Sequence, residues 1–316
     1  MKLGIIGTGR IANRFVPEAK EADEFHIESV YNPRISSAQS FAEKWEIPNS
    51  TDNWATFCSR IDVAYVASPH DTHYEYCRQL LLQGKHVLCE KPLCFSGEEA
   101  KELFAIAQEQ KLILMEAVKT AYCPGFTELI KIARSGVIGE IKDIEACFTK
   151  LENPAGRELN SELYAGSFYE MGTYTLLPII KLLGKPKDVY FQAIRTGQRN
   201  ADGFMKAHLL YEDAFALAKT GLTVKSEGCL IISGTKGYIL AQSPWWLTKK
   251  FEVRFEDVSA TKTYEFAFEG QGLRYEIKAF AERIKKETDV SNAEDFGLTS
   301  QESVWLAEVM EQVGKV

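Results

Sequence analysis

The segment KLGIIGTGRIA, residues 2–12, decides the fold that this sequence predicts. Its first half is a short apolar run, and its second half has the form G-x-G-x-x-A and leads directly into a helical pattern. In a strand–turn–helix unit, Gly7 allows a tight turn, Gly9 lets the backbone approach a pyrophosphate, and Ala12 allows close helix–strand packing. A plain tight turn is the alternative. The residues expected to bind a dinucleotide here are Gly7, Thr8, Gly9, Arg10 and Ile11.

The order of predicted elements indicates two domains. Strands and helices alternate up to about residue 117, which is typical of a doubly wound parallel sheet. From about residue 188 onward, short strands follow one another without helices between them, which favours an antiparallel or mixed sheet. We therefore expect an α/β Rossmann domain over residues 1–118 and an α+β domain with a large, mostly antiparallel open sheet over residues 119–316.

Composition narrows the class of function. The chain has 316 residues, a net charge of -7 and scattered Lys and Arg residues, so a nucleic-acid surface is not expected. No segment reaches the ~18 uninterrupted apolar residues of a membrane span. The first residues run straight into the predicted strand without the pattern of a signal peptide, and we expect a cytoplasmic protein. The expected partner is a small molecule.

The seven cysteines predict neither a disulfide framework nor a metal centre. Their number is odd, they show no C-x-x-C spacing, and several lie in apolar strand or helix patterns. Cys89 and Cys94 are four residues apart in a C-x4-C arrangement, but no second ligand pair accompanies them. We expect free thiols and no metal site.

The end of the second predicted strand bears on the choice of cofactor. A fold that prefers NAD usually places Asp or Glu there to hold the ribose 2'-hydroxyl, whereas this chain has Asn32. Arg34 follows two residues later, so NADP is slightly favoured over NAD. The alternative is that Arg34 only caps or solvates the loop.

Two further loops lie at the carboxyl ends of predicted strands, where ligands of open α/β sheets bind. The first, SPHDTH at residues 68–73, follows the strand at 62–67 and is the expected place of the nicotinamide or its ribose. Its candidate cofactor contacts are Ser68, Pro69, His70 and His73. Both histidines are possible acid–base groups, and a structural role for His73 is the alternative.

The second loop begins at VLCEKP, residues 87–92, where a short apolar strand ends in two opposite charges and a proline. Pro92 pushes Lys91 out of helical conformation and presents its ammonium beyond the strand end. A surface ion pair is the alternative interpretation. Glu90 either orients Lys91 or pairs with another cation.

Several of these segments together carry a resemblance to a known family. GTGRIA, SPHDTH, GKHVLCEKPL and LILMEAVKTAYCP resemble the Gfo/Idh/MocA oxidoreductases, the glucose-fructose oxidoreductase and inositol dehydrogenase group, over essentially the full length. The nearest branch is that of trans-1,2-dihydrobenzene-1,2-diol dehydrogenase, whose members often have Trp where this chain has Lys119. The resemblance implies an NAD(P)-dependent dehydrogenase or reductase that acts on CH–OH groups of a sugar, polyol or diol.

The resemblance also assigns roles to GSFYEMGTY, residues 166–174. The family often has G-G-x-x-x-D-x-G-x-[HY] here, with the last residue as acid–base, so Tyr174 takes that role and Glu170 replaces the usual Asp. The residues alone instead favour Tyr174 as a half-buried aromatic with Glu170 as its solvated neighbour. With Lys91 and Glu90 at the strand end, this gives Lys91, Tyr174 and Glu170 as catalytic candidates, and Glu90 and Lys91 also as cofactor contacts.

Magnitudes make the pairing of Lys91 with Tyr174 chemically reasonable. An ammonium at ~4 Å in an effective dielectric of ~20 stabilises a phenolate by about 4 kcal/mol, which would bring a tyrosine of pKa ~10 toward neutral pH. Because the two residues fall in different predicted domains, we expect the active site between the domains. A catalytically silent NADP-binding regulator and a transhydrogenase with tightly held cofactor remain alternatives. The open sheet predicts a homodimer or higher oligomer.

Overall fold

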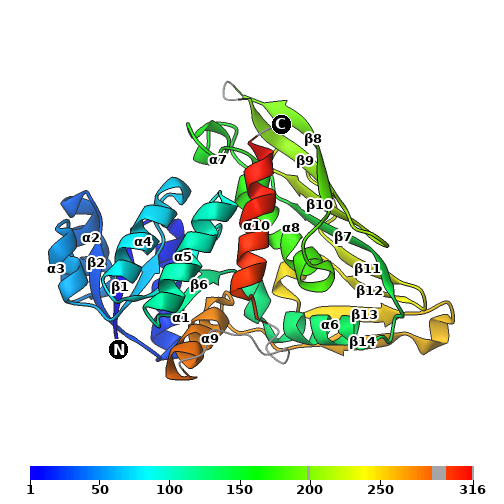
Figure 1. Ribbon diagram of the computed structural model, residues 1–316, viewed down its shortest axis with the longest axis horizontal. Helices are drawn as coiled ribbons and strands as arrows, with labels where there is room; N and C mark the ends of the chain where they lie inside the picture. The colour runs from blue at the N-terminus through cyan, green and yellow to red at the C-terminus, as the bar shows by residue number, and fades with distance from the viewer. Residues whose placement is uncertain (198–199, 287–296, 315–316) are drawn as a thin grey trace. The chain divides into compact units, whose positions relative to one another are not determined.

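The computed structural model describes residues 1–197, 200–286 and 297–314, which form two compact units (Figure 1). Unit 1 comprises Met1–Lys119 and Glu269–Ser303, and unit 2 comprises Thr120–Phe268 and Val304–Val316. The sequence placed a single boundary after residue 118. The chain instead returns to unit 1 near its C-terminal end, so each unit contains two separate stretches of sequence.

The sheet of unit 1 is parallel throughout its described strands. In spatial order these strands are β3 (Asn49–Thr51), β2 (His26–Tyr31), β1 (Lys2–Ile6), β4 (Val63–Val66), β5 (His86–Glu90) and β6 (Leu114–Ala117). From β1 the sheet extends in both directions, through β2 and β3 on one side and through β4, β5 and β6 on the other. This order confirms the predicted doubly wound α/β fold. All four residues of β4 are buried, as expected of a central strand covered on both faces.

Helices connect and cover these strands. They are α1 (Arg10–Ala22), α2 (Ile35–Trp45), α3 (Trp54–Ser59), α4 (His73–Leu82), α5 (Gly97–Glu109) and α9 (Leu273–Lys286). The sequence analysis did not assign β3 and α3. With the sequence NST, β3 is three residues long and has no apolar alternation, so its pattern carried no strand signal.

Helix α9 explains why the C-terminal stretch belongs to unit 1. It packs against α1, where the Arg274 guanidinium lies 3.0 Å from the Glu18 carboxylate, and the rings of Phe25 and Phe280 are 5.8 Å apart. The apolar residues of α9 recur at helical spacing. Its apolar periodicity could not reveal which unit it would join.

The sheet of unit 2 is antiparallel except for one described pair. Its strands, in spatial order, are β14 (Lys262–Glu265), β13 (Lys250–Arg254), β12 (Tyr238–Ala241), β11 (Leu230–Gly234), β7 (Ile141–Thr149), β10 (Phe215–Gly221), β9 (Ala201–Leu210) and β8 (Asp188–Thr196). Only β7 and β10 run parallel among the described pairs. The predicted α+β class with a mostly antiparallel sheet is confirmed, although the sequence analysis missed the short strands β12 and β14.

Helices gather on one face of this sheet (Figure 1). They are α6 (Pro124–Arg134), the short α7 (Arg157–Asn160), α8 (Ser167–Leu183) and α10 (Ser300–Val313). Helix α8 packs on β7, β9 and β10. It begins at Ser167 because Tyr164 and Gly166, just before it, have positive φ angles of 58° and 136°, which lie outside the helical region.

Two further observations concern the chain as a whole. All seven cysteines are free thiols, and all except Cys229 are buried. No helix in the described ranges combines the length and the apolar character that crossing a membrane requires.

Candidate cofactor and active site

The loop between β1 and α1 has the geometry of a phosphate-binding turn. Gly7 has φ +96°, and a Cβ there would lie 2.4 Å from the Ala67 carbonyl oxygen, so only glycine fits. A Cβ on Gly9 would meet nothing within 4 Å, which leaves open space at the start of α1. The first turn of α1 contains no acidic residue. Backbone amides, open space and the absence of a repelling carboxylate suit a pyrophosphate.

Asn32 lies beside this loop. Its Nδ2 donates to the Thr8 Oγ1 at 3.1 Å, and its Oδ1 accepts from the Arg34 backbone amide at 2.9 Å. Arg34 occupies the N-cap position of α2, is exposed, and makes no side-chain capping bond. The structure therefore joins Thr8, Asn32 and Arg34 at one edge of the loop, where the ribose end of a dinucleotide would lie.

His73 is a buried connector. Its Nδ1 lies 2.8 Å from the Pro92 carbonyl oxygen and its Nε2 lies 3.1 Å from the Ser68 carbonyl oxygen. Burial lowers the pKa of His73, although both carbonyls and Asp71 oppose that effect. A neutral ring donates to only one carbonyl. His73 thus ties the loop after β4 to the segment after Lys91, which matches the structural alternative for this residue.

His70 lies in the short 3-10 helix η1 (His70–Thr72) and is half-buried. Its ring centroid is 5.6 Å from that of His73 and 6.2 Å from that of Phe95. The Thr72 hydroxyl donates within the same loop to the Pro69 carbonyl oxygen at 2.7 Å. The predicted contacts Ser68, Pro69, His70 and His73 therefore form one ordered loop at the carboxyl end of β4.

The two charged residues at the end of β5 differ in burial. Lys91 is half-buried, whereas Glu90 is buried and accepts a hydrogen bond from the Tyr65 hydroxyl at 2.6 Å. The Lys91 backbone amide also donates to the Glu90 carboxylate. Burial raises the pKa of Glu90, while Tyr65 and Lys91 act in the opposite direction. Glu90, a candidate cofactor contact, thus directs its carboxyl group into the core of unit 1.

The second set of candidates lies on α8 in unit 2. Tyr174 is half-buried, and its ring centroid is 5.5 Å from that of Phe148 on β7. Phe148 in turn stacks on Trp246 with ring centroids 3.7 Å apart and planes 6° from parallel. Phe148 and Trp246 were not predicted from the sequence as site residues. No local signal could have paired them, because they are almost one hundred residues apart and both match ordinary core patterns.

Glu170 is one helical turn before Tyr174 on α8. Its carboxylate lies 4.0 Å from the Arg157 guanidinium, and its side chain is mostly shielded from solvent. Arg157 also lies 3.7 Å from Glu158. The charge of Glu170 therefore has a largely exposed cation as a neighbour in α7.

The start of α8 is held by a residue from β9. Asp202 accepts hydrogen bonds from the Ser167 hydroxyl at 2.6 Å and from the Phe168 backbone amide at 2.9 Å. The Ser167 hydroxyl also lies 2.8 Å from the Thr220 hydroxyl. Burial raises the pKa of Asp202 to about 6, against the effect of these hydrogen bonds. The sequence analysis did not single out Asp202, whose partner lies 35 positions earlier.

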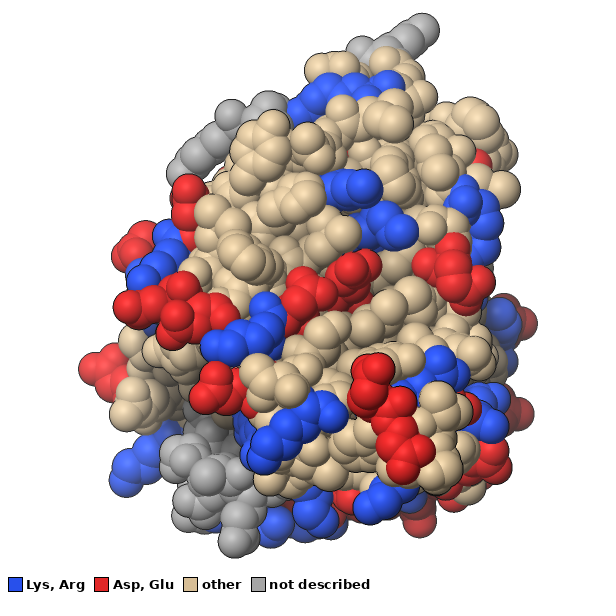
Figure 2. Space-filling view, turned by 90° about the vertical axis from the view of Figure 1, so that its right-hand side faces the viewer, with Lys and Arg blue, Asp and Glu red and all other residues tan. Residues whose placement is uncertain are grey.

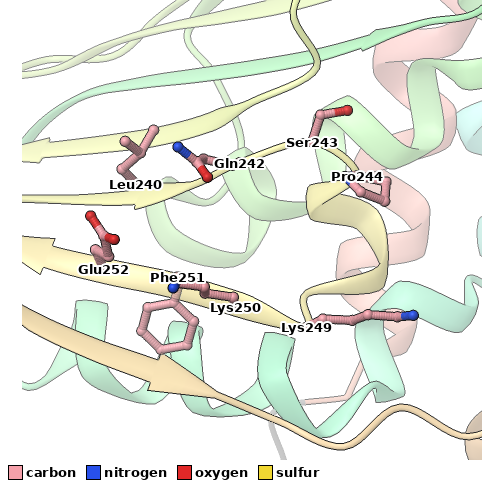
Figure 3. A pocket seen from close by; sticks show the side chains of 8 residues that line it. All are labelled: Leu240, Gln242, Ser243, Pro244, Lys249, Lys250, Phe251 and Glu252. Carbon is pink, nitrogen blue, oxygen red and sulfur yellow. The ribbon is translucent and has the colours of Figure 1, made fainter.

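A separate cavity opens in unit 2 (Figure 3). It holds about 220 Å³ and is lined by Leu240, Gln242, Ser243, Pro244, Lys249, Lys250, Phe251 and Glu252. These residues come from β12, β13 and the connection between them. None of them is a predicted site residue.

Family comparisons agree with this architecture. Residues 1–118 match the oxidoreductase family with an NAD-binding Rossmann fold, and residues 126–240 match the Gfo/Idh/MocA C-terminal domain. The chain belongs to the Gfo/Idh/MocA oxidoreductase family. The resemblance drawn from the sequence motifs is therefore confirmed, as are an NAD(P) cofactor and an NAD(P)-dependent dehydrogenase or reductase.

Relatives of this Gfo/Idh/MocA protein cover its full length. It is 28% identical to the scyllo-inositol 2-dehydrogenase (NADP(+)) IolU of Bacillus subtilis and 27% identical to the trans-1,2-dihydrobenzene-1,2-diol dehydrogenase of Sus scrofa, over 100% of this chain and 96% of each relative. Its fold resembles that of the 3-ketoreductase KijD10 of Actinomadura kijaniata in complex with NADP and TDP-benzene, with a TM-score of 0.83 and 24% identity over 100% of this chain and 97% of the other. Levoglucosan dehydrogenase, solved with NADH and levoglucosan, gives a TM-score of 0.84 at 17% identity, over 100% and 98% of the two chains.

Proposed function

We propose that this protein oxidises or reduces a sugar, polyol or diol at a carbinol or carbonyl carbon, with Tyr174 as acid–base and Lys91 as its assistant. The observation that carries the proposal is the end of β5 in a Rossmann sheet, where Glu90 is buried and hydrogen-bonded to Tyr65 and the half-buried Lys91 follows directly after the strand. The scyllo-inositol and dihydrodiol dehydrogenases similar to this chain support the substrate class.

Each proposed group has a distinct task. Lys91 binds the substrate oxygen and stabilises the negative charge that develops on it, and Tyr174 exchanges the hydroxyl proton. When bound, the nicotinamide supplies or accepts the hydride. Glu170 binds a neighbouring substrate hydroxyl, and the stacked rings of Phe148 and Trp246 beside Tyr174 offer an apolar surface to the substrate carbon skeleton.

The same proposal extends to cofactor preference. Asn32 at the end of β2 brings no carboxylate to repel a 2'-phosphate, and exposed Arg34 starts α2 two residues later. We therefore expect NADPH to bind more tightly than NADH, with a change in fluorescence. Arg34→Ala should weaken NADPH binding and leave NADH binding nearly unchanged. Equal binding of the two cofactors by the wild type would remove the preference.

The catalytic roles are tested by turnover of matched variants. Lys91→Ala and Tyr174→Phe should each lower turnover by at least ~100-fold, the usual scale of acid–base catalysis, while NADPH still binds. Tyr169→Phe is the control, because Tyr169 lies on the same helix and faces Tyr164 instead. If Tyr174→Phe keeps wild-type turnover, the proton donor must be reassigned, and His70 is the next candidate.

The substrate class is tested by a panel of aldoses, inositols, diols and dicarbonyls with NADP+ or NADPH, followed at the nicotinamide absorbance. Turnover of one class, lost in Lys91→Ala, supports the enzyme. Cofactor binding without turnover of any compound would instead favour a cofactor-binding regulatory protein of the same fold.

The open face of the sheet in unit 2 supports self-association. Tyr190 and Ile194 on β8, Leu210 on β9 and Phe215 on β10 are exposed, and the strand registers place them on one face. Figure 2 shows broad uncharged areas between charged side chains. We propose a homodimer or higher oligomer through this face. Sedimentation of wild type and Phe215→Glu at micromolar concentration tests this, and a monomeric wild type would contradict it.

A further inference from the structure

Three carboxyl groups are buried together in unit 1 near the end of β5. Glu90 on β5, Glu116 on β6 and Glu276 on α9 are each less than a tenth exposed. Buried carboxyl groups require partners or must stay neutral, because an isolated ionised carboxylate away from water is strongly unfavourable. The protonation of these three groups therefore sets the negative charge in this part of the core, and the charge of Lys91 acts on two of them, Glu90 and Glu116.

Tyr65 fixes one of them. Its ring stacks on Phe15 with centroids 3.6 Å apart and planes 10° from parallel, so the hydroxyl has a defined position in the core. That hydroxyl donates to the Glu90 Oε1 at 2.6 Å. Burial and the charge of Glu90 raise the pKa of Tyr65 well above its usual value, so Tyr65 remains the donor. A short bond of this kind favours the ionised form of the acceptor.

Glu276 is in the opposite situation. It is 1% exposed, and within the described residues neither of its carboxyl oxygens has a hydrogen-bond partner. An ionised carboxylate in this position would have no hydrogen-bond donor to replace its lost hydration. Burial of the protonated, neutral acid is much less unfavourable. Burial raises its pKa, the charges of Glu90 and Glu18 raise it further, and Lys119 opposes them.

Charged and titratable groups from several elements act on this network. They are Glu18 of α1, Tyr65 of β4, Cys77 of α4, Cys89 and Lys91 of β5 or its end, Glu116 of β6, Lys119 of the 3-10 helix η2 (Lys119–Tyr122), and Glu276 of α9. The Lys119 ammonium also donates to the Gln271 carbonyl oxygen at 2.8 Å. The charges of Lys91 and Lys119 both lower the pKa of Glu90.

We propose that Tyr65 and Glu276 are positioning residues that act on Lys91 through Glu90. Tyr65 holds Glu90 as a carboxylate bonded to the Lys91 backbone amide, and Glu276 keeps its proton so that Glu90 carries the negative charge that orients the Lys91 ammonium. Neighbouring buried carboxyl groups do not both ionise readily, so a proton on one supports the charge on the other. This inference rests on the proposed role of Lys91.

The first test removes only the Tyr65 hydroxyl. In Tyr65→Phe the ring keeps its stacking on Phe15, but Glu90 loses a donor and takes up a proton at higher pH. We expect kcat to fall by about tenfold or more, and the acid limb of the kcat/KM profile to move upward by about one to two pH units. The pH profile separates this role from a general loss of stability.

Tyr74→Phe is the matched control. Tyr74 donates to Glu102 at the same 2.6 Å in the same unit, but that pair is on the surface between α4 and α5. Its removal should leave the pH profile in place. An unshifted acid limb in Tyr65→Phe, or equal shifts in the two variants, would overturn the role of Tyr65.

The second test observes the proton on Glu276 directly. The infrared difference between wild type and Glu276→Gln at neutral pH should contain the carbonyl band of one protonated carboxyl group, since glutamine has the shape of the neutral acid. Carboxylate bands in that difference would show that Glu276 is ionised and would overturn its assignment.

The same measurements separate this inference from the proposed function. If Lys91→Ala retains wild-type turnover, the catalytic role of Lys91 fails, whatever Tyr65→Phe does. If Lys91→Ala is inactive and Tyr65→Phe has a wild-type pH profile, the catalytic role stands and the positioning network fails.

Discussion

Glu18 in unit 1 and Asp202 in unit 2 are buried carboxyl groups with the same task and different surroundings. Each accepts a hydrogen bond from a backbone amide at the start of a helix that is distant in sequence, and so fixes where that helix begins. Each also faces a glycine with a positive φ angle, Gly270 beside Glu18 and Gly166 beside Asp202.

The donors around Glu18 include a cation. Its carboxylate accepts from the Gln271 and Arg274 backbone amides at 3.1 and 3.2 Å, and from the Arg274 guanidinium Nε and Nη2 at 3.1 and 3.0 Å. Burial raises the pKa of Glu18, but these bonds and the charge of Arg274 outweigh it, so the pKa lies below its usual value. Glu18 is therefore an ionised anchor for α9.

The donors bound to Asp202 are neutral. A hydroxyl from Ser167 and an amide from Phe168 both bond to Oδ2, and the nearby charge of Arg195 has only a small effect. Burial then dominates and raises the pKa to about 6. A strong neighbouring cation lowers the pKa of the capping carboxyl group at Glu18, and without such a cation the pKa is raised at Asp202. Two similar helix caps therefore make contributions to stability that depend on pH in opposite directions.

The largest expected effect comes from filling the two glycine positions. A Cβ on Gly166 would lie 1.9 Å from the Asp202 Oδ1, and a Cβ on Gly270 would lie 2.0 Å from the Glu18 Oε1. Gly166 has φ 136° and ψ 166°, a region open almost only to glycine. We expect Gly166→Ala to lower the free energy of unfolding by about 3 kcal/mol or more, and Gly270→Ala by somewhat less.

Urea unfolding measures these losses, with Gly84→Ala as the control. Gly84 has φ +72° and open space around its Cβ position, so only the backbone cost of about 1 kcal/mol applies. If Gly166→Ala were no more destabilised than Gly84→Ala, the close contact with Asp202 would have no energetic consequence.

The second prediction concerns removal of the carboxyl groups themselves. Glu18→Ala leaves the mostly buried Arg274 guanidinium without its main partner, and we expect a loss of about 3 kcal/mol. Asp202→Ala removes a helix cap with neutral donors, and a loss of about 1 to 2 kcal/mol is expected at pH 7. Unfolding in urea at pH 7 compares the two. A larger loss for Asp202→Ala would contradict the importance assigned to the cation.

Local signals explain which parts of the candidate site the sequence revealed. Parallel strands buried on both faces are short continuous apolar runs, so β4 and β5 were found close to their observed ends. Gly7 and Lys91 belong to contiguous motifs whose place at strand ends follows from the alternation of strand and helix. Tyr174 was found only through the family pattern, because a half-buried aromatic on a helix is ordinary.

Contacts between distant positions explain what the sequence left hidden. Arg274 lies 256 positions after Glu18, and no feature near either residue identifies the other. Asp202 is likewise a lone acidic residue in a strand pattern until the fold brings it to the start of α8. Tyr65 was part of an apolar run, and only the pairing of β4 with β5 placed its hydroxyl against Glu90.

The smallest and sharpest effect is the opposite response of the two anchors to pH. The pKa of Asp202 is raised from its usual 3.8 to about 6, so its stabilising contribution is complete below 3.8 and is lost as the pH rises through about 6. Wild type should therefore gain about 1 kcal/mol relative to Asp202→Asn between pH 7 and pH 5. The pKa of Glu18 is lowered from 4.5, so its contribution is present above 4.5 and is lost as the pH falls below that value.

Urea unfolding of wild type, Asp202→Asn and Glu18→Gln from pH 7 to pH 4 follows both contributions. Asparagine keeps an acceptor for Ser167 and Phe168, and glutamine keeps an acceptor for the start of α9, so each variant removes mainly the charge. The advantage of wild type over Asp202→Asn should grow as the pH falls from 7 to 4, most steeply below about pH 6, whereas the advantage of wild type over Glu18→Gln should shrink as the pH falls below about 4.5. If the two differences in the free energy of unfolding changed in the same direction with pH, the charge of Arg274 would not distinguish Glu18 from Asp202, because burial alone raises the pKa of both.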